Sequence, residues 1–374
     1  MKTCFLLAVI PTSVWLPLII TAAALSLLAF LWKRMTLYVF SRLEYRREFS
    51  DGGVFEGDRL QLIETLINPT PFPIFFVDAE AYVYSGLEFA DYIPETDNNM
   101  QYMVSRFTLM PYMKIRRKHN IDGRRRGYYR LESAQLWKGK NNRYVESVAD
   151  VYIYPKMLDP GFLPRPLSVL QGNNVSSRRL ISDPFSFAGI RDYRFGDSMS
   201  SINFKASAKA PVYDYSGIKV NERDFCSNRS IMIYINFQTD TEEPMPTKIY
   251  SELMENALSY ASELIYEAIS EGYRVGLSAN CRSMDASDKL MLPMLSGNDH
   301  YLTLLKALST ARTEAGASVL ALFEKDLQEC VSSAEFYFMT AHITDEIHQK
   351  IAALERYSNT VNIIKLSEDF GKYE

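Results

Sequence analysis

An uncharged apolar run near the N-terminus constrains this chain more than any other feature. From Cys4 to Trp32 no residue carries a charge. At about 29 residues the run is longer than the ~20 that an apolar helix needs to cross a bilayer. Pro11 and Pro17 interrupt it, so two arrangements stay open: a single span over residues 14–32, or a hairpin of two short segments that turns near the prolines.

The charges on the two sides of this run predict its orientation. Only Lys2 precedes the run, whereas basic residues follow it closely, and cytoplasmic flanks are enriched in Lys and Arg. The run is also too long for a cleaved signal peptide, and it leads directly into basic residues. We therefore predict that residues 1–42 are a membrane anchor and that the rest of the chain faces the cytoplasm. The basic flank consists of Lys33, Arg34, Arg42, Arg46 and Arg47.

Composition narrows the classes of function without choosing one. A formal net charge of −4 gives no overall signal for nucleic-acid binding. The isolated His119 and His300 and the scattered cysteines do not assemble three converging zinc ligands. The cysteines also lack a Cys-x-x-Cys pair, which argues against a disulfide framework, and we predict no cofactor. The four cysteines are Cys4, Cys226, Cys281 and Cys330.

Residues 43–166 have the pattern of a β-rich domain. Short apolar or alternating runs recur with turn signals between them, and residues 68–73 form a proline-rich cluster that no helix tolerates. Asp122-Gly123 is a favourable hairpin turn pair. We expect a β-sandwich.

Residues 229–374 change to an alternation of strands and helices. Ile231–Phe237 is an apolar run interrupted only by Asn236, as in a central parallel strand, and apolar residues between 249 and 269 follow the spacing of one buried helix face. Further strands are expected at 274–281, 335–340 and 360–366. The whole chain is thus expected to be an α+β multidomain protein whose C-terminal part is a doubly wound α/β domain.

Between these domains lies a segment with no helical or strand period. Gly189-Ile190-Arg191-Asp192-Tyr193-Arg194-Phe195-Gly196-Asp197 alternates charges with aromatics and glycines. It continues to Ile202-Asn203-Phe204-Lys205-Ala206-Ser207-Ala208. The pattern indicates an ordered connector, over residues 167–228, whose side chains have specific partners.

This segment closely resembles the signature of the bacterial domain-of-unknown-function family 58 (DUF58). That signature is Gly-x-Arg-Glu/Asp-Tyr-x-x-Gly-Asp, followed by Arg-x-Ile-x-Trp-Lys-x-Ser-Ala. The chain departs from it at Ser200, the usual Arg, and at Phe204, the usual Trp. The resemblance implies an anchor in the bacterial cytoplasmic membrane, an immunoglobulin-like sandwich and a C-terminal von Willebrand factor A-like domain. It also implies association with a MoxR-type AAA+ ATPase and with other von Willebrand A-containing proteins.

The signature residues have two interpretations. Arg191, Asp192, Arg194 and Asp197 could form an ion-pair network that locks the sandwich to the sheet, with Phe204 packed in that junction. Alternatively, the same surface docks a partner, since arginine and aromatic residues are frequent interface anchors. The candidate signature residues are Gly189, Arg191, Asp192, Tyr193, Gly196, Asp197, Phe204, Lys205 and Ser207.

A metal site is predicted to be degenerate. Ligands of doubly wound sheets bind at the carboxyl ends of the strands. Metal-binding von Willebrand A-like domains place Asp-x-Ser-x-Ser there, whereas this chain has Asn236, Gln238 and Asp240. Divalent cations need several oxygen ligands, preferably charged, and one carboxylate is not enough.

A basic stretch near residues 114–130 leaves three alternatives open. It could be a solvated hairpin, a surface for anionic lipid or an acidic partner, or a nucleic-acid site, the last of which we do not expect. Its central residues are Arg116, Arg117, Lys118, Arg124, Arg125 and Arg126.

Together these features favour a non-enzymatic, membrane-anchored interaction or adaptor protein, which the resemblance links to envelope or complex-assembly processes. Two alternatives remain: a metal-dependent ligand-binding receptor, and an enzyme whose site has no recognisable motif.

Overall fold

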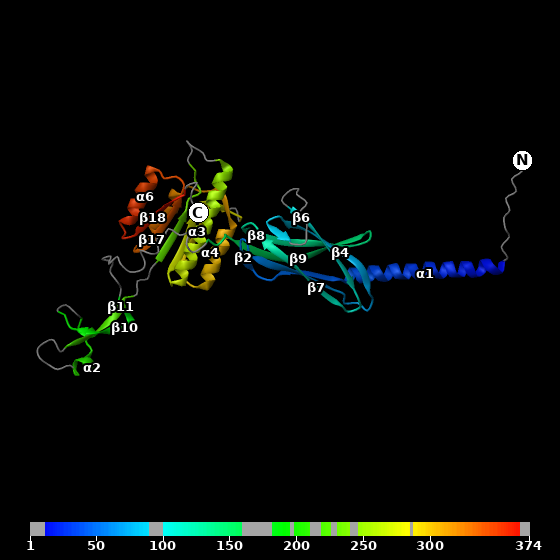
Figure 1. Ribbon diagram of the computed structural model, residues 1–374, viewed down its shortest axis with the longest axis horizontal. Helices are drawn as coiled ribbons and strands as arrows, with labels where there is room; N and C mark the ends of the chain where they lie inside the picture. Colours follow the sequence, from blue (N-terminus) through cyan, green and yellow to red (C-terminus); the bar gives the residue numbers. More distant parts are fainter. Residues whose placement is uncertain are drawn as a thin grey trace. The chain divides into compact units, whose positions relative to one another are not determined.

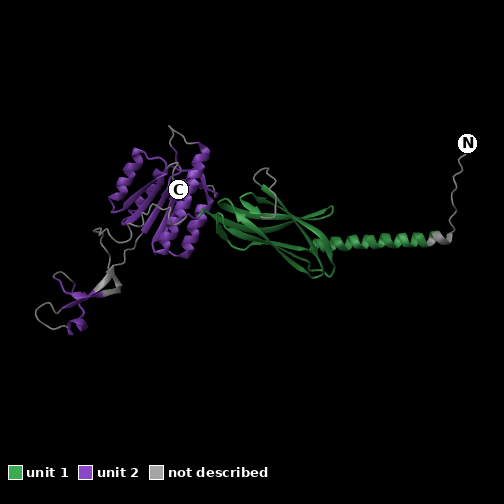
Figure 2. Cartoon of the chain, in the orientation of Figure 1, with its two compact units in different colours: residues 1–156 green, residues 157–374 purple. Residues whose placement is uncertain are grey.

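The structure, a computed structural model, divides the chain into two compact units, residues 1–156 and 157–374 (Figure 2). Each unit has its own hydrophobic core. The predicted anchor, residues 1–42, belongs to the first unit. The residues described are 12–89, 100–158, 182–194, 198–209, 218–225, 230–239, 246–284 and 287–366.

From Thr12 onward the apolar run is helical, and this helix, α1 (Thr12–Arg42), extends beyond Trp32 at the end of the run (Figure 1). Its stretch 17–42 is long and apolar enough to cross a membrane. Pro17 lies inside the helix rather than at a turn, while Pro11 lies outside the described residues. The last turn of α1 is different from the rest, because Val39 and Phe40 are buried in the core of the following domain.

That domain is a pair of β-sheets, which confirms the β-rich prediction for this part of the chain. The first sheet has the order β1-β3-β7-β5 and the second the order β2-β9-β8-β4-β6. Neighbouring strands are antiparallel except β2 and β9. The first sheet consists of β1 (Glu44–Phe49), β3 (Arg59–Ile67), β5 (Leu87–Phe89) and β7 (Lys114–Gly123). The second consists of β2 (Gly53–Phe55), β4 (Ile74–Tyr84), β6 (Met100–Leu109), β8 (Gly127–Lys138) and β9 (Asn141–Tyr154).

The hairpin expected at Asp122-Gly123 is wrong. Both residues belong to β7, where Gly123 pairs with Leu87, and the next strand, β8, lies in the other sheet. A side chain at position 123 would meet Ile153 at 3.1 Å. The glycine therefore allows the two sheets to pack closely where the chain passes from one to the other, which a local turn signal does not reveal.

The second unit contains a small two-stranded lobe. β10 (Ser182–Asp192) and β11 (Lys219–Phe225) pair antiparallel. Between them in the sequence lie the short helices η2 (Met199–Ser201) and α2 (Phe204–Ser207). Most of the signature residues lie on this lobe, and Gly196 and Asp197 lie outside the described residues.

The rest of the second unit is a five-stranded sheet with helices on both faces (Figure 1). Its order is β15-β13-β12-β17-β18, and β15 alone runs antiparallel to its neighbour. In β12, Ile231 and Ile233 face the core shared with α3 and α4, while Tyr234 faces the core shared with α5 and α6. The strands are β12 (Ser230–Ile235), β13 (Arg274–Ala279), β15 (Leu290–Leu295), β17 (Ala334–Thr340) and β18 (Thr360–Lys365), with β14 (Cys281–Ser283) and β16 (Ala311–Ala315) paired separately. The helices are α3 (Thr247–Ser270), α4 (Asn298–Thr310), α5 (Leu320–Gln328) and α6 (Asp345–Glu355).

A buried polar network lies within the sandwich. Glu64 is fully buried, accepts a hydrogen bond from the Tyr45 hydroxyl, and lies 2.8 Å from His119 Nε2. Burial alone would raise the pKa of the Glu64 carboxyl, but hydrogen bonds from His119, Ser105 and Tyr45 outweigh it and hold the pKa below its ordinary value. Burial and the nearby carboxylate raise the pKa of Tyr45 well above its ordinary value, so the hydroxyl stays protonated and donates.

Arg47 is also part of this buried region rather than of the exposed basic flank. Its backbone N–H donates to Ser147 Oγ at 2.8 Å, and its Nη2 donates to the Ser147 carbonyl at 2.9 Å. Residues 44–49 form a strand whose alternate side chains point inward, which explains why Arg46 is exposed and Arg47 is not.

We expect Glu64 to make the stability of the protein sensitive to acid. A carboxyl whose folded-state pKa is lower than its unfolded-state pKa contributes stability that is present above the unfolded value and is lost as the pH falls through the folded value. Glu64→Gln should therefore lower the free energy of unfolding at pH 7 by roughly 1–3 kcal/mol and flatten its decline in acid. Denaturant unfolding of wild type and variant, from pH 7 down through the folded-state pKa of Glu64, measures both effects.

Glu132→Gln is the matched control, because the Glu132 side chain is mostly exposed. It should follow the wild-type curve. If Glu64→Gln did so too, Glu64 would not have the role assigned to it.

Candidate functional site

The carboxyl ends of three parallel strands bring polar residues together in the second unit. β12 lies between β13 and β17 in parallel register, so the residues that end these strands are neighbours. They are Asn236, Asn280 and Thr340, and all three are buried. Two of these positions, Asn236 and Thr340, were expected at the strand ends from the sequence, and Asn280 was not.

These residues form a closed set of hydrogen bonds. Asn236 Nδ2 donates to Thr340 Oγ1 at 3.0 Å, and Asn280 Nδ2 donates to Asn236 Oδ1 at 2.9 Å. Asn236 Oδ1 also accepts from the backbone N–H of Gln238 at 3.0 Å. The other side of the Asn280 amide is used as well, because its Oδ1 accepts from the Phe237 N–H at 2.6 Å.

The remaining polar groups at this strand end are also hydrogen-bonded. Thr340 Oγ1 donates to the His342 carbonyl at 2.6 Å, and Gln238 Oε1 accepts from the Val319 N–H at 3.2 Å. The described part of this strand end is therefore neutral and internally satisfied. Asp240 lies outside the described residues. Among the residues that the structure describes, no group of three His, Cys, Asp or Glu side chains is placed to hold a metal.

The signature lobe is held together by its own side chains. Asn203 Oδ1 caps α2 by accepting from the Ala206 N–H at 2.9 Å, and its Nδ2 donates to Asn221 Oδ1 at 2.7 Å. Ser207 Oγ accepts from the Lys219 N–H at 2.8 Å. These contacts attach the short helix to β11, and they give Ser207, a signature residue, a structural role.

The charged signature residues make local contacts. Asp192 pairs with Lys219 at 2.5 Å on the adjacent strand, and Arg191 Nη1 donates to the Asp192 carbonyl at 3.0 Å. The Asp192 carboxylate remains mostly exposed. Tyr193 donates its backbone N–H to the Ile218 carbonyl at 2.9 Å, and Gly189 has open space around it.

The packing of Phe204 in a junction between the domains, one of the two interpretations of the signature, stays a prediction, but the lobe itself does not bury this residue. Its side chain is 77% exposed. The physical reason is the shortness of α2: the helix is attached through Asn203 and Ser207, and Phe204 and Lys205 extend from it into solvent. Met199 and Ile190 on the same lobe are also exposed. The lobe thus presents apolar side chains on a hydrogen-bonded frame.

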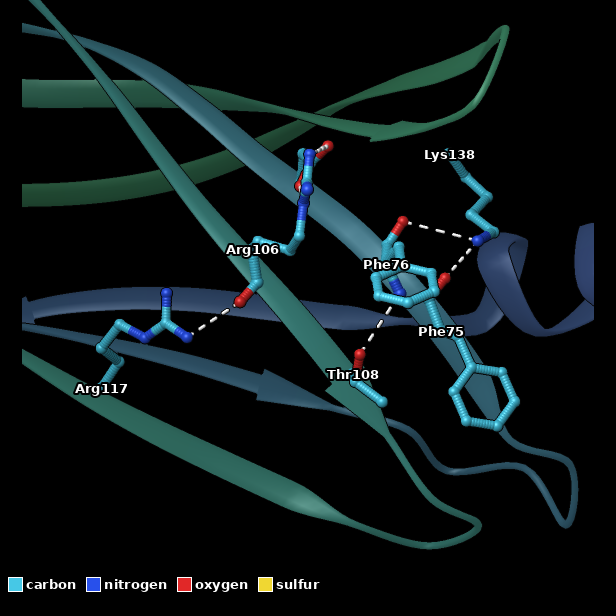
Figure 3. A network of polar contacts seen from close by, with 7 residues as sticks. Phe75, Phe76, Arg106, Thr108, Arg117 and Lys138 are labelled. Atoms are coloured by element: carbon cyan, nitrogen blue, oxygen red, sulfur yellow. Dashed lines mark hydrogen bonds and ion pairs between the residues drawn. The ribbon is translucent and has the colours of Figure 1, made fainter.

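The basic stretch does not form a single basic face. Alternate residues of β7 point to opposite sides of the strand. The Arg117 guanidinium lies over the Phe107 ring, with its Cζ 4.6 Å from the ring centroid. Arg117 also donates to the Arg106 carbonyl at 2.8 Å (Figure 3), so its role is structural. Acidic partners neutralise two other members of this region, in the pairs Arg116–Glu48 and Arg124–Glu88, and Asp122 within the region pairs with Arg59 of β3.

Comparison with known proteins gives distant similarities. No family model matches the sequence. The uncharacterized protein YeaD of Bacillus subtilis (strain 168) is 20% identical over 324 residues, which cover 84% of this chain and 74% of that protein. The chain is also similar to two solved β-rich domains, both at a TM-score of 0.22. One is the CARDB domain of the PF1109 protein from Pyrococcus furiosus, with 14% identity over 30% of this chain and 93% of that one. The other is a cohesin module from Clostridium perfringens, with 12% identity over 29% and 98%. Likenesses at this TM-score support no inference about function.

The amide network at the strand ends predicts how a carboxylate at position 236 would affect stability. Asn236→Asp loses the N–H donor to Thr340 and places a charge in a buried, neutral site. We expect the free energy of unfolding to fall by about 1–3 kcal/mol. Thermal unfolding with and without millimolar Mg²⁺ or Mn²⁺ is the measurement, because a ligand bound only to the native state raises the unfolding temperature.

The wild type should show no shift with either cation. Thr340→Val removes the hydrogen bond with Asn236 and the one that Thr340 donates to the His342 carbonyl, but adds no charge, so a larger loss of stability in Asn236→Asp than in Thr340→Val would be due to burial of the carboxylate. A cation-dependent rise in the wild-type unfolding temperature would contradict the degenerate-site assignment.

Proposed function

We propose that this protein is a membrane-anchored, non-enzymatic interaction protein of the DUF58 family. It would act as an adaptor with a MoxR-type AAA+ ATPase in envelope or complex assembly, from the bacterial cytoplasmic membrane. The observation that carries the proposal is the closed amide network at the strand ends of the second unit. Doubly wound domains bind their ligands at this position. Here the polar groups at this position are hydrogen-bonded to one another.

The arrangement of the second unit supports its assignment as a von Willebrand A-like domain. Parallel strands alternate with helices that cover both faces of the sheet, and polar residues gather at the carboxyl strand ends. In this copy those residues are amides and a threonine. The alternative of a metal-dependent receptor depends on charged ligands, and the described strand end supplies none.

The two buried polar centres described above also favour interaction over catalysis. Glu64 lies inside the sandwich among hydrogen-bond partners, and Asn236 uses both ends of its amide. A catalytic group must reach the atoms of a substrate. Glu64 and Asn236 are buried and hydrogen-bonded to other groups of the protein, so we assign them a role in stability and assign partner binding to the surface.

The signature lobe is the surface we assign to partner docking. Phe204, Met199 and Ile190 are exposed on a small frame that is itself hydrogen-bonded. Aromatic and methionine side chains are enriched in protein interfaces, and a few such residues supply most of the binding energy. A rigid frame also lowers the entropic cost of binding.

Removing the apolar side chains of the lobe should abolish capture of the partner without unfolding the protein. We expect a tagged wild-type chain to capture an AAA+ ATPase from detergent-solubilised native membranes, and the double variant Phe204→Ser, Met199→Ser to lose it. Because both side chains are exposed, the free energy of unfolding should change by less than about 0.5 kcal/mol.

Tyr357→Ser is the matched control, since Tyr357 is an exposed aromatic residue elsewhere in the second unit. It should capture the ATPase like the wild type. Absence of any AAA+ ATPase from the wild-type complex would refute the proposed partner. Equal capture by the double variant would refute the docking surface.

The proposed topology places Cys330 in the cytoplasm. Cys330 is exposed, whereas Cys281 is buried. In a chain with Cys4 and Cys226 replaced by serine, a membrane-impermeant maleimide should label Cys330 only after the cytoplasmic membrane is permeabilised. Labelling is read by the mass shift of the purified protein.

Cys330→Ser in the same background should abolish the signal and so identify the site. Efficient labelling of Cys330 in spheroplasts with an intact membrane would reverse the assigned orientation.

A further inference from the structure

The end of the sandwich from which α1 emerges carries a group of exposed apolar side chains. They lie on two neighbouring connections, β3–β4 and β6–β7, and on the first residues of β4. Such side chains exposed together in one place mark a binding surface more often than a solvated one. We call this group the rim; it consists of Phe72, Phe76, Met110, Tyr112 and Met113.

The rim is held in place by buried hydrogen bonds. Asn68 is fully buried, and its Nδ2 donates to the carbonyls of Phe72, at 2.8 Å, and Met110, at 3.0 Å. The backbone N–H of Asn68 donates to the Met113 carbonyl at 2.9 Å. One asparagine therefore ties the two connections together, and the exposure of their apolar side chains is built into the fold.

Two rim residues have a backbone conformation that their side chains disfavour. Phe76 and Tyr112 have φ values of 54° and 55°, in the left-handed region. For residues other than glycine this costs roughly 1–2 kcal/mol. Glycine or asparagine would adopt the left-handed conformation more easily, so the backbone conformation does not favour a large aromatic residue at either position.

The backbone at Phe76 is supported from the neighbouring strands. The pairing of β4 with β6 is irregular between Ile74 and Val77, and Phe76 donates its N–H to Thr108 Oγ1 at 3.4 Å. Lys138, at the end of β8, donates to the carbonyls of Phe75 and Phe76 (Figure 3). These contacts fix a conformation that leaves the Phe76 ring exposed.

The rim lies where α1 would leave the bilayer. Phe72 lines a shallow hollow together with α1 residues that include Trp32, Arg34 and Tyr38. Because an α-helix rises about 1.5 Å per residue, Arg34 and Tyr38 lie about 3 Å and about 9 Å beyond Trp32 along the helix axis. The headgroup layer beyond the hydrocarbon core is about 5–7 Å thick. Trp32 and Tyr38 are themselves half-exposed aromatic residues, the type that settles in this layer.

The charged residues near the rim also favour contact with the lipid headgroup layer. Lys33 and Arg34 on α1 and Lys114 at the start of β7 are exposed and close in sequence to the rim or to the hollow. Cations near an anionic leaflet contribute about 1 kcal/mol each. Apolar side chains flanked by cations are the composition that binds in a lipid interface.

We infer that the rim is a second membrane contact, which inserts into the lipid interface around the chain's own α1. The inference rests on the proposed membrane anchoring, and it adds that the sandwich is held against the bilayer in one orientation. The contact would restrict the sandwich relative to the membrane plane rather than leave it free at the end of a helix.

Site-specific quenching in nanodiscs tests this inference with the full chain. A bimane label is attached to Tyr112→Cys at the rim, to Tyr82→Cys at the other end of β4, or to Leu25→Cys in α1. The exposed cysteine and those outside the described residues are first replaced by serine. Tyr82 is the matched control, because it is 68% exposed and Tyr112 is 71% exposed. The nanodiscs contain phosphatidylcholine and phosphatidylglycerol with spin labels at a shallow or a deep acyl position.

We expect deep spin labels to quench Leu25→Cys and shallow ones to quench Tyr112→Cys several-fold more strongly than Tyr82→Cys. An unquenched Leu25→Cys would refute the membrane anchoring itself. Quenching of Leu25→Cys without quenching of Tyr112→Cys would refute the rim contact alone. Protection of Tyr112→Cys from both lipid spin labels and aqueous iodide would also refute it, because a protein would then cover the rim.

A second variant separates lipid contact from a structural role of the rim. Phe76→Asn, Tyr112→Asn removes both rings and places asparagine, which tolerates the left-handed region, at both positions. With the label at Met113→Cys, quenching by shallow spin labels should fall to the level of Tyr82→Cys while the unfolding temperature stays equal or rises. Retained quenching together with a lowered unfolding temperature would show that the rings support the fold and would overturn the inference.

Discussion

The first unit depends on how the last turn of α1 enters the sandwich. Val39 and Phe40 are buried in the same core as Leu62 and Val83. The carbonyls near the end of a helix lack partners within it. Here Arg143 donates to the carbonyls of Ser41 and Leu43, and its guanidinium lies over the Phe40 ring at 5.9 Å. The helix end is thus fixed by apolar burial and by charge-assisted hydrogen bonds. A tilt or rotation of α1 in a bilayer would therefore be transmitted to the sandwich.

Much of the fold could be predicted from the sequence because the relevant signals are local. The apolar run allows a single long helix as one of its two arrangements, and the apolar residues 231–235 are typical of a strand covered on both faces. The β7–β8 connection could not be predicted, because Asp-Gly has the same local preference at a hairpin and at the end of a strand. Which sheet receives the next strand is decided by packing such as that of Ile153 against Gly123, between residues far apart in the sequence.

In the candidate sites, too, features set by local sequence could be predicted, and features set by residues far apart in the sequence could not. Asn236 and Gln238 could be placed at a strand end from the sequence, since they directly follow an apolar strand. Their closure by Asn280 could not, because that hydrogen bond joins residues 44 positions apart. His119 looked isolated for the same reason, because its partner Glu64 lies 55 positions away. The exposure of Phe204 was also hidden, since an aromatic residue in a short helix gives no sign of which side will be covered.

Asparagine side chains make recurring hydrogen-bonded links in this chain, with two different results. At the strand ends, Asn236 and Asn280 are hydrogen-bonded to each other. Asn68 in the sandwich and Asn203 in the lobe instead join two chain segments, and so hold large apolar side chains outward. An amide is suited to this because it donates and accepts at once and carries no charge that burial would penalise. Where such groups satisfy one another internally, their hydrogen bonds join neighbouring strand ends. Where they support exposed rings, their hydrogen bonds prepare a surface that can bind without being ordered first.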